Sequence, residues 1–395
     1  MPWKETRALE LRRALIQSWE VGEESLAELC RQYSISRQTA YKWIHRYEAD
    51  GVDGLEELSR APKHSPHQLD AEVIERIVAC RGKHPSWGPR KLLVHLAKQY
   101  PRLDWPAAST VAELLKRKGL SQARKKRLRT PAHTRPLLEV NQANQVWCAD
   151  FKGWFRTGDG QRCDPLTITD AWSRFLIRCQ IVPTTNLEET QAVFQAAFRE
   201  YGLPERIRTD NGVPFATRAP GGLSRLSIWW LKLGIEPERI PPGQPQYNGR
   251  HERFHRTLKA ETAKPPARNL RQQQQRFHEF SRSFNHDRPH EALDYKTPAS
   301  LHQGSWREYP SRLPEITYPD DMVLRRVSQQ GSVRWKSRRE YISETLGHEV
   351  VGLRAIDDRY WEVYFAPIKL GVLDTYKMQF KPERPQWKNR NPKAP

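Results

Sequence analysis

The spacing of apolar residues changes twice along this chain, near residue 145 and again after residue 298. Before the first change, apolar residues recur at the intervals that are typical of amphipathic helices. From Gln145 onwards, aromatic and β-branched residues alternate with polar ones, which indicates strands, and helical patterns are interspersed among them. After Pro298 short alternating runs follow. Because one fold does not accommodate all these periodicities, the sequence predicts several domains of different class.

The N-terminal region, residues 1–58, has the pattern of an all-α helix-turn-helix module. Helical patterns cover residues 6–19, 25–33 and 36–50, with a short connection between the last two. In the third segment Ala40, Ile44 and Tyr47 form the expected buried stripe. The outward positions that would contact DNA are Arg37, Gln38, Lys42 and Arg46. An ordinary three-helix bundle with a solvated polar face is the alternative interpretation of this pattern.

A second helical, helix-turn-helix-like DNA-binding module is expected over residues 67–122. Its helices are predicted from Leu69, over residues 91–99 and over residues 107–118, with Val111, Leu114 and Leu115 facing inward. Two modules in tandem would contact more DNA than one.

The charge balance indicates a polyanionic partner, because the chain has 66 Lys and Arg against 46 Asp and Glu, a net charge of +20. The basic linker over residues 123–140 is the strongest local example. Nine Lys or Arg and no acidic residue lie between Lys116 and Arg135. We expect this segment to lie along DNA phosphates through Lys125, Lys126, Arg127 and Arg129, the alternative being a linker that is merely soluble.

The cysteines and the hydropathy indicate a reducing, intracellular location. The chain has five scattered cysteines, Cys30, Cys80, Cys148, Cys163 and Cys179. Because their number is odd and they form no close pair, neither a disulfide framework nor a cysteine zinc site is predicted. No run of 18 apolar residues occurs, so we expect a soluble protein with no membrane partner.

The central part of the chain is predicted to be an α/β domain with a mixed sheet flanked by helices. Strands are expected over residues 146–155, 164–171, 175–182, 206–209 and 238–240, and helices over 187–201, over 223–233 and from Arg250, interrupted near Pro265. Further strands over 323–327, 331–335, 350–355, 360–365 and 368–374 predict a small β-barrel within residues 318–380, before a basic tail over residues 381–395.

Three carboxylates occupy positions that an ordinary core would avoid. Asp150 lies in an apolar strand pattern, Asp210 ends a strand before the turn Asn211-Gly212, and Glu252 begins a helix. Carboxylates at such places are costly unless a cation compensates them. Two Mg²⁺ or Mn²⁺ ions roughly 4 Å apart would suit phosphodiester chemistry and oxygen ligands. We therefore predict that Asp150 bridges both metals, with Asp210 on one and Glu252 on the other as catalytic ligands.

The motifs around these carboxylates resemble a family. Trp147-x-x-Asp150, Thr209-Asp210-Asn211-Gly212, Asn248-Gly249-Arg250-x-Glu252-Arg253-Phe254 and Asn285-His286-x-Arg288-Pro289-His290 resemble the integrase-core transposases of bacterial insertion sequences. The resemblance covers roughly residues 144–301, and more loosely Trp87-Gly88-x-Arg90. It implies a ribonuclease-H-like catalytic core over residues 141–305 with an Asp-Asp-Glu site. One departure is the 41 residues, 211–251, between the second Asp and the Glu, whose excess is expected within residues 215–226.

The function implied by this resemblance is DNA transposition. The enzyme would bind the terminal inverted repeats of its element, hydrolyse the 3′ ends and transfer them to target DNA. Joining two ends in concert implies a homo-oligomer, a dimer or larger, acting in the bacterial cytoplasm on the nucleoid. Two alternatives are a domesticated, non-catalytic, sequence-specific DNA-binding regulator and a stand-alone nuclease.

Other residues near the predicted site have further expected roles. Arg256 and Lys259 share a helix face with Glu252 and could hold the DNA end, unless that face is merely solvated. Asp170 is expected to cap a turn. Arg288 and His290 could approach the scissile phosphate or bind backbone carbonyls.

Overall fold

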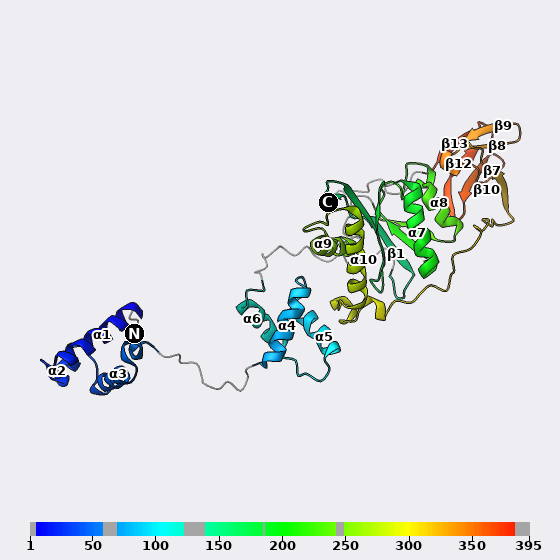
Figure 1. Cartoon of the computed structure of the whole chain (residues 1–395). Helices are drawn as coiled ribbons and strands as arrows, with labels where there is room; N and C mark the ends of the chain where they lie inside the picture. The colour runs from blue at the N-terminus through cyan, green and yellow to red at the C-terminus, as the bar shows by residue number, and fades with distance from the viewer. Residues whose placement is uncertain (1–4, 58–68, 122–138, 185, 242–248, 384–395) are drawn as a thin grey trace. The chain divides into compact units, whose positions relative to one another are not determined.

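The structure, a computed structural model, describes residues 5–57, 69–121, 139–184, 186–241 and 249–383. The chain divides into two compact units, residues 1–68 and residues 69–395 (Figure 1). The boundary follows residue 68, so it lies just before Leu69, where the first helix of the second module is predicted to begin. Each unit is described by itself.

The first unit has the predicted helix-turn-helix layout. Its helices are α1 (Glu5–Val21), α2 (Leu26–Gln32) and α3 (Arg37–Asp50). Ser25 and Ser36 cap α2 and α3, each accepting a hydrogen bond from a backbone N–H three residues further on. Of the predicted stripe, Ala40 and Ile44 are buried and Tyr47 is only half-buried, whereas Trp43, which the pattern did not indicate, is buried. These caps and this stripe set the two helices on either side of the turn.

The second unit begins with the second helical module. It contains α4 (Ala71–Lys83), α5 (Pro89–Gln99) and α6 (Ala108–Arg117). Val111, Leu114 and Leu115 are buried, as predicted, against Ile77 and Trp87. This module therefore has an apolar core of its own.

A mixed sheet forms the centre of the catalytic core. Its described strands are β1 (Val146–Phe151), β2 (Phe155–Arg156), β3 (Arg162–Asp170), β4 (Leu176–Val182), β5 (Arg206–Thr209) and β6 (Glu236–Arg239). They run in the order β4-β3-β1-β5-β6, with β2 beside β3. The ladders β1–β3 and β3–β4 are antiparallel, and β1–β5 and β5–β6 are parallel. This is the ribonuclease-H-like arrangement that the resemblance implies.

One predicted strand is wrong in extent. The sequence predicts a continuous strand over residues 146–155, whereas β1 ends at Phe151 and β2 begins at Phe155. Gly153 between them has a φ of 84°, a left-handed conformation that interrupts a strand.

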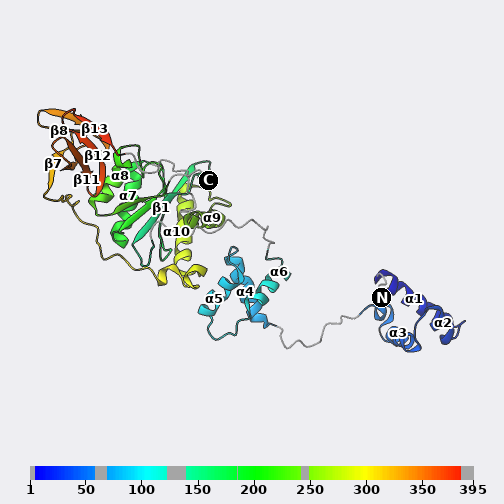
Figure 2. The same cartoon turned by 180° about the vertical axis from the view of Figure 1, so that it is seen from behind.

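Helices cover both faces of the sheet. In both views, α7 (Leu187–Tyr201) and α8 (Arg225–Lys232) lie on one side of β1, and α9 (Gly249–Thr262) and α10 (Leu270–His286) lie on the other (Figures 1 and 2). Trp147 packs with Phe198 on the α7 side. Because side chains alternate along a strand, Cys148 and Asp150 lie on the α9 side.

The C-terminal strands do not close into the predicted barrel. The strands are β7 (Met322–Arg326), β8 (Ser332–Trp335), β9 (Arg338–Tyr341), β10 (Val350–Ala355), β11 (Tyr360–Phe365), β12 (Ile368–Asp374) and β13 (Gln379–Pro382). Among the described residues they form an open antiparallel sheet, β13-β12-β11-β10-β7, and a separate hairpin, β8-β9. A bridge between Val327 and Val333 joins the hairpin to one edge. At the other edge, Glu340 of β9 accepts a hydrogen bond from the Phe380 N–H of β13. This side-chain contact takes the place of backbone pairing between the two strands.

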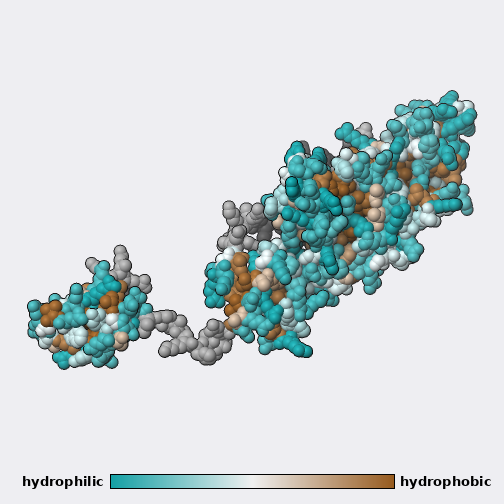
Figure 3. Space-filling model, viewed as in Figure 1, coloured by the Kyte–Doolittle hydropathy of each residue, from teal (hydrophilic) through white to brown (hydrophobic). Residues whose placement is uncertain are grey.

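The C-terminal sheet packs on the catalytic core. Leu223, Ile228 and Leu231 belong to the same buried cluster as Val351 and Leu370. The face shown in Figure 3 is largely hydrophilic. Within the described part of the chain, no helix combines the length and the apolar character needed to cross a membrane.

Candidate active site

Asp150 and Asp210 occupy matching positions on two adjacent parallel strands. The last paired residues of β1 and β5 in the register are Cys148 and Arg208, and each aspartate lies two residues further along its own strand direction. Neighbouring strands are about 4.8 Å apart. The register therefore brings both carboxylates to the same carboxyl edge of the sheet, where open α/β sheets bind their ligands.

Asp210 is held by the turn that follows β5. Its Oδ1 accepts a hydrogen bond from the Gly212 N–H at 3.0 Å, and Asn211 Nδ2 donates to the Ile240 carbonyl at 2.7 Å. A Cβ atom added at Gly212 would lie 3.2 and 3.3 Å from the two carboxylate oxygens of Asp210. A glycine at this position thus allows the turn to wrap around an exposed carboxylate.

Asp150 faces a network that joins β1, β3 and α9. Thr167 is its partner in the β1–β3 register, and Thr167 Oγ1 donates to the Asp150 carbonyl at 3.0 Å. The same oxygen lies 2.8 Å from His251 Nε2 and 2.7 Å from His255 Nε2. Since the hydroxyl hydrogen is used by the carbonyl, both imidazoles donate from Nε2. The Nδ1 atom of each imidazole then carries a lone pair.

The His255 Nδ1 atom lies 4.0 Å from Asp150 Oδ2. Asp150, His251 and His255 form a group whose ligand atoms all lie within 4.8 Å of one another. Burial lowers the pKa of His251 to about 3. Burial also lowers the pKa of His255, and the neighbouring His251 and Lys152 lower it further. Two neutral imidazoles and a carboxylate are groups that a divalent cation accepts as ligands or as close neighbours.

Glu252 lies in the first turn of α9, and its side chain is exposed. It is not a member of the close group around Asp150. The helix that carries it is anchored on the sheet by the buried residues His251, Phe254 and Leu258. Arg256 and Lys259, four and seven positions further on, are also exposed, as the helical spacing predicts.

Several side chains near Asp150 were not predicted from the sequence. His251 and His255 are four residues apart on one helix with Glu252 between them, a spacing that could have drawn attention to them. Thr167 could be found only from the register of β1 and β3. Lys152 follows Asp150 by two residues, and burial and the charge of Lys259 lower its pKa.

The predicted turn cap at Asp170 is confirmed. Asp170 Oδ1 accepts hydrogen bonds from the Ser173 N–H and Oγ–H at 2.7 Å each. Arg288, for which two roles were open, donates instead to the Glu261 carboxylate at 2.7 Å.

The DNA-contacting residues predicted on α3 are not equivalent in the structure. Arg37, Gln38 and Lys42 are exposed. Arg46 is half-buried, because its Nη2 donates to the Glu56 carbonyl at 2.7 Å and its guanidinium lies 4.8 Å from the Trp43 ring centroid. Lys125, Lys126, Arg127 and Arg129 lie outside the described residues.

Family models match most of the chain in separate segments. Integrase core domain models match residues 140–245 and 233–298. A helix-turn-helix domain model matches residues 11–63, and a homeodomain-like domain model matches residues 39–115. The integrase core matches therefore include Asp150, Asp210 and Glu252.

Curated relatives match across most of their own length. Transposase InsD for insertion element IS2-9 of Escherichia coli (strain K12) is 26% identical over 316 residues, which cover 75% of this chain and 93% of the relative. Transposase InsD for insertion element IS2D of the same strain is 28% identical over 307 residues, covering 72% of this chain and 92% of the relative. Both alignments leave out only a minor part of either protein.

Among solved structures, a chain of the simian T-cell lymphotropic virus intasome is 16% identical, and the match covers 74% of this chain and 97% of that chain. The TM-score of this match is 0.37.

Proposed function

The chain belongs to the bacterial insertion-sequence transposases that carry an integrase core, and we propose that Asp150, Asp210 and Glu252 are its catalytic carboxylates. It is a DNA transposase, a polynucleotidyl transferase. We propose that it hydrolyses the 3′ ends of its element and joins them to target DNA. The observation that supports the residue assignment most directly is the matched position of Asp150 and Asp210 at the ends of β1 and β5.

The donor set fits a divalent cation at this edge. Asp150 Oδ2 and the lone pair of His255 Nδ1 lie 4.0 Å apart, and neither has a proton to offer the other. A cation near Asp150 would remove the electrostatic repulsion between the Asp150 oxygen and the lone pair of His255 Nδ1. Asp150, Asp210 and Glu252 would hold Mg²⁺ or Mn²⁺, and we propose two ions. When bound, the metal activates the attacking oxygen and stabilises the leaving oxygen of the phosphodiester.

The remaining side chains position the DNA and the helix. Thr167 binds both histidines of α9, so the helix that carries Glu252 is fixed at the Asp150 strand. Arg256 and Lys259, exposed on the same helix as Glu252, and Lys152, two residues after Asp150, would bind phosphates of the DNA end. Proximity and charge neutralisation are therefore the protein's own contribution to the reaction.

DNA recognition is assigned to the helical modules and basic segments. In the first unit, α3 presents Arg37, Gln38 and Lys42 to a major groove. The second module over residues 67–122, the linker over residues 123–140 and the tail over residues 381–395 would extend the contact along terminal inverted repeats and target DNA.

Two element ends must be joined together in one event, and each chain contains one site of this kind. We therefore propose that the protein acts as a homo-oligomer, a dimer or larger, on DNA in the bacterial nucleoid. The C-terminal strands over residues 318–380 would complete the chain's contacts in that assembly.

The test uses labelled duplexes that carry the inverted repeats flanking the gene. With Mg²⁺, the wild-type protein is expected to bind the duplex and hydrolyse a phosphodiester at its 3′ end. Asp210→Asn is expected to bind with unchanged affinity and to lose hydrolysis. If the wild-type protein binds the repeat but cuts under no divalent metal, the non-catalytic regulator replaces the transposase as the correct account.

A further inference from the structure

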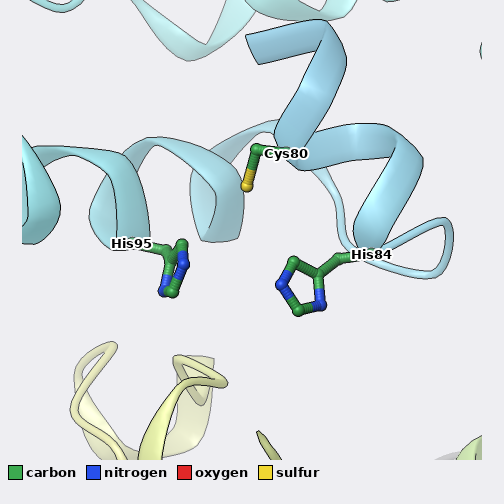
Figure 4. Close-up of side chains that lie close together, drawn as sticks. All are labelled: Cys80, His84 and His95. Carbon is green, nitrogen blue, oxygen red and sulfur yellow. The ribbon is translucent and has the colours of Figure 1, made fainter. Parts of the chain in front are cut away.

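A second group of metal-ligating side chains lies in the second helical module, away from the carboxylates of the catalytic core. Cys80 and His84 come from the end of α4 and His95 from α5. Their ligand atoms, one from each side chain, all lie within 4.8 Å of one another. Figure 4 shows the Cys80 sulfur and the two imidazoles turned toward a common space. We propose that these three residues bind a zinc ion.

The helix geometry explains why the three side chains converge. Cys80 and His84 are four residues apart, so they share one face of the last turn of α4. His95 lies on the facing turn of α5, inside the same pocket. Spacing along the sequence does not indicate this group, because the third ligand comes from another helix.

The chemistry of the group selects the metal class. A thiolate and imidazoles suit Zn²⁺, whereas Mg²⁺ prefers oxygen ligands. Burial lowers the pKa of both His84 and His95, a shift in the same direction as the neutral form that a metal ligand needs. Zinc needs a fourth ligand, which Asp287 would supply: this residue at the end of α10 lines the same pocket, although its carboxylate is not a member of the close group.

A hydrogen bond to the backbone at Asp287 also orients the His95 ring. Histidines that bind metals usually donate their second ring N–H to such a group. The zinc would thereby connect the second helical module to the end of α10 in the catalytic core.

Aromatic packing accounts for part of the arrangement but not for all of it. The His84 ring stacks on Trp87 with centroids 3.8 Å apart, and His95 meets the Trp87 ring edge-on at 5.2 Å. These contacts explain where the rings lie. They give no reason for a buried thiol to lie against two imidazoles.

The test is cobalt titration of the full-length protein after treatment with a chelator. Thiolate ligation gives a charge-transfer absorption that the carboxylate and histidine groups of the catalytic core do not produce. We expect this band to saturate at one equivalent in the wild-type protein and in Cys30→Ala, a control that removes a buried thiol from the first unit. Cys80→Ser should lose the band, and Asp287→Asn should weaken cobalt binding roughly 10- to 100-fold.

Zinc content, measured on protein purified without added metal, is the companion experiment. One equivalent in the wild-type protein and its loss in Cys80→Ser would support the site. Absence of the charge-transfer band in a folded wild-type protein, or a band that persists in Cys80→Ser, would overturn the proposal and leave the group as aromatic packing.

A separate observation concerns a cationic pocket between β1, the turn after β3, α9 and the segment after α10. Among the described residues, the only carboxylate in its lining is Asp170. The lining includes five arginines and one lysine, namely Lys91, Arg174, Arg208, Arg250, Arg253 and Arg288. Two guanidinium nitrogens in this pocket, Arg174 Nε and Arg208 Nη2, are buried without a hydrogen-bond partner. Buried donors of this kind are costly unless a ligand satisfies them.

Arg174 also holds a strained backbone. Its φ is 62°, in the left-handed region that favours glycine. The Asp170 carboxylate is already engaged by Ser173 and by the Asn144 N–H, which donates at 2.7 Å. Arg174 therefore combines a strained backbone with a buried guanidinium whose Nε has no hydrogen-bond partner.

We infer that this pocket binds a phosphate group of a DNA strand, an inference that rests on the proposed function of the chain as a transposase. The lining also contains Phe254 and Phe284, which would contact the sugar or base attached to that phosphate. The pocket would hold one nucleotide of the strand beside α9.

Arg174→Gly distinguishes this role from a structural one, because glycine relieves the left-handed strain while removing the guanidinium. We expect calorimetric titration with a 5′-phosphorylated dinucleotide to show at least a tenfold loss of affinity in Arg174→Gly, with a thermal midpoint equal to or above that of the wild type. Arg178→Ala, which removes an arginine outside the pocket, should bind as the wild type does.

Unchanged dinucleotide affinity in Arg174→Gly, or a lowered thermal midpoint, would overturn the inference. So would equal binding of the 5′-hydroxyl dinucleotide, or an equal affinity for inorganic phosphate, which would indicate a site for the free anion. Because binding is measured without cleavage, this result is independent of the catalytic test.

Discussion

His255 Nδ1 and Asp150 Oδ2 face each other across 4.0 Å, at the point where α9 meets the end of β1. Thr167 fixes the imidazole from its other side, at 2.7 Å from Nε2. This relationship connects the strand that carries Asp150 to the helix that carries Glu252.

Removing that connection should reduce catalysis more than DNA binding. We expect His255→Ala to lower the rate of 3′-end hydrolysis roughly 10- to 100-fold, as loss of a group that orients a metal ligand does. His278→Ala, an exposed histidine on α10, is the matched control. Equal hydrolysis rates in His255→Ala and the control, measured at saturating DNA, would show that the imidazole has no part in the site.

Gly212→Ala tests the turn that holds Asp210. The added Cβ would lie 3.2 Å from Asp210 Oδ2, closer than ordinary van der Waals contact, so the carboxylate must shift. We expect roughly a 10- to 100-fold lower hydrolysis rate with little change in thermal midpoint. At Gly304 the nearest atom to an added Cβ is 3.8 Å away, so Gly304→Ala should be neutral. Full activity in Gly212→Ala would contradict the account of this turn.

The residues of α3 should separate into two groups. Lys42→Ala should weaken DNA binding and lower the salt dependence of log K by about 0.9 for a lost phosphate contact, without affecting stability. Arg46→Ala should also destabilise the first unit by about 1 kcal/mol, because it loses the hydrogen bond to the Glu56 carbonyl. Thermal melts and binding isotherms at several salt concentrations measure both effects, and equal melts for the two variants would contradict this distinction.

Phe277 tests the packing of α10 on the sheet. Its side chain is fully buried among Cys163, Cys179 and Leu258. We expect Phe277→Ala to lower the free energy of unfolding of the second unit by roughly 3–5 kcal/mol. Arg282→Ala, on an exposed position of the same helix, should have little effect on chemical denaturation. If Phe277→Ala lowered the free energy of unfolding as little as Arg282→Ala does, the packing of α10 on the sheet would not stabilise this core.

Much of the fold could be predicted because local patterns determine it. The helix over residues 187–201 and the strands over residues 350–355 and 360–365 begin and end where the sequence predicts. The strand over residues 146–155 was predicted too long, because the alternation of apolar residues does not indicate the left-handed conformation of Gly153. Barrel closure was predicted from the number of short strands, but it depends on whether β9 and β13 pair, a long-range property.

The site was predictable to the extent that single residues signal it. Asp150 and Asp210 stand out at strand positions where a carboxylate is costly, and the structure places them at matching positions of adjacent strands. Thr167 and the group around Cys80 could not be predicted, because they depend on strand register and on the facing of two helices. Local sequence contains neither kind of information.

We propose that Asp150, Asp210 and Glu252 together carry out the chemistry. The most direct measurement is strand transfer of a labelled element end into supercoiled target DNA with Mg²⁺, comparing Glu252→Gln with Glu279→Gln, an exposed glutamate on α10. We expect Glu279→Gln to join DNA as the wild type does, and Glu252→Gln to bind the element end but to form no joined product. Strand transfer by Glu252→Gln at the wild-type rate would contradict this proposal.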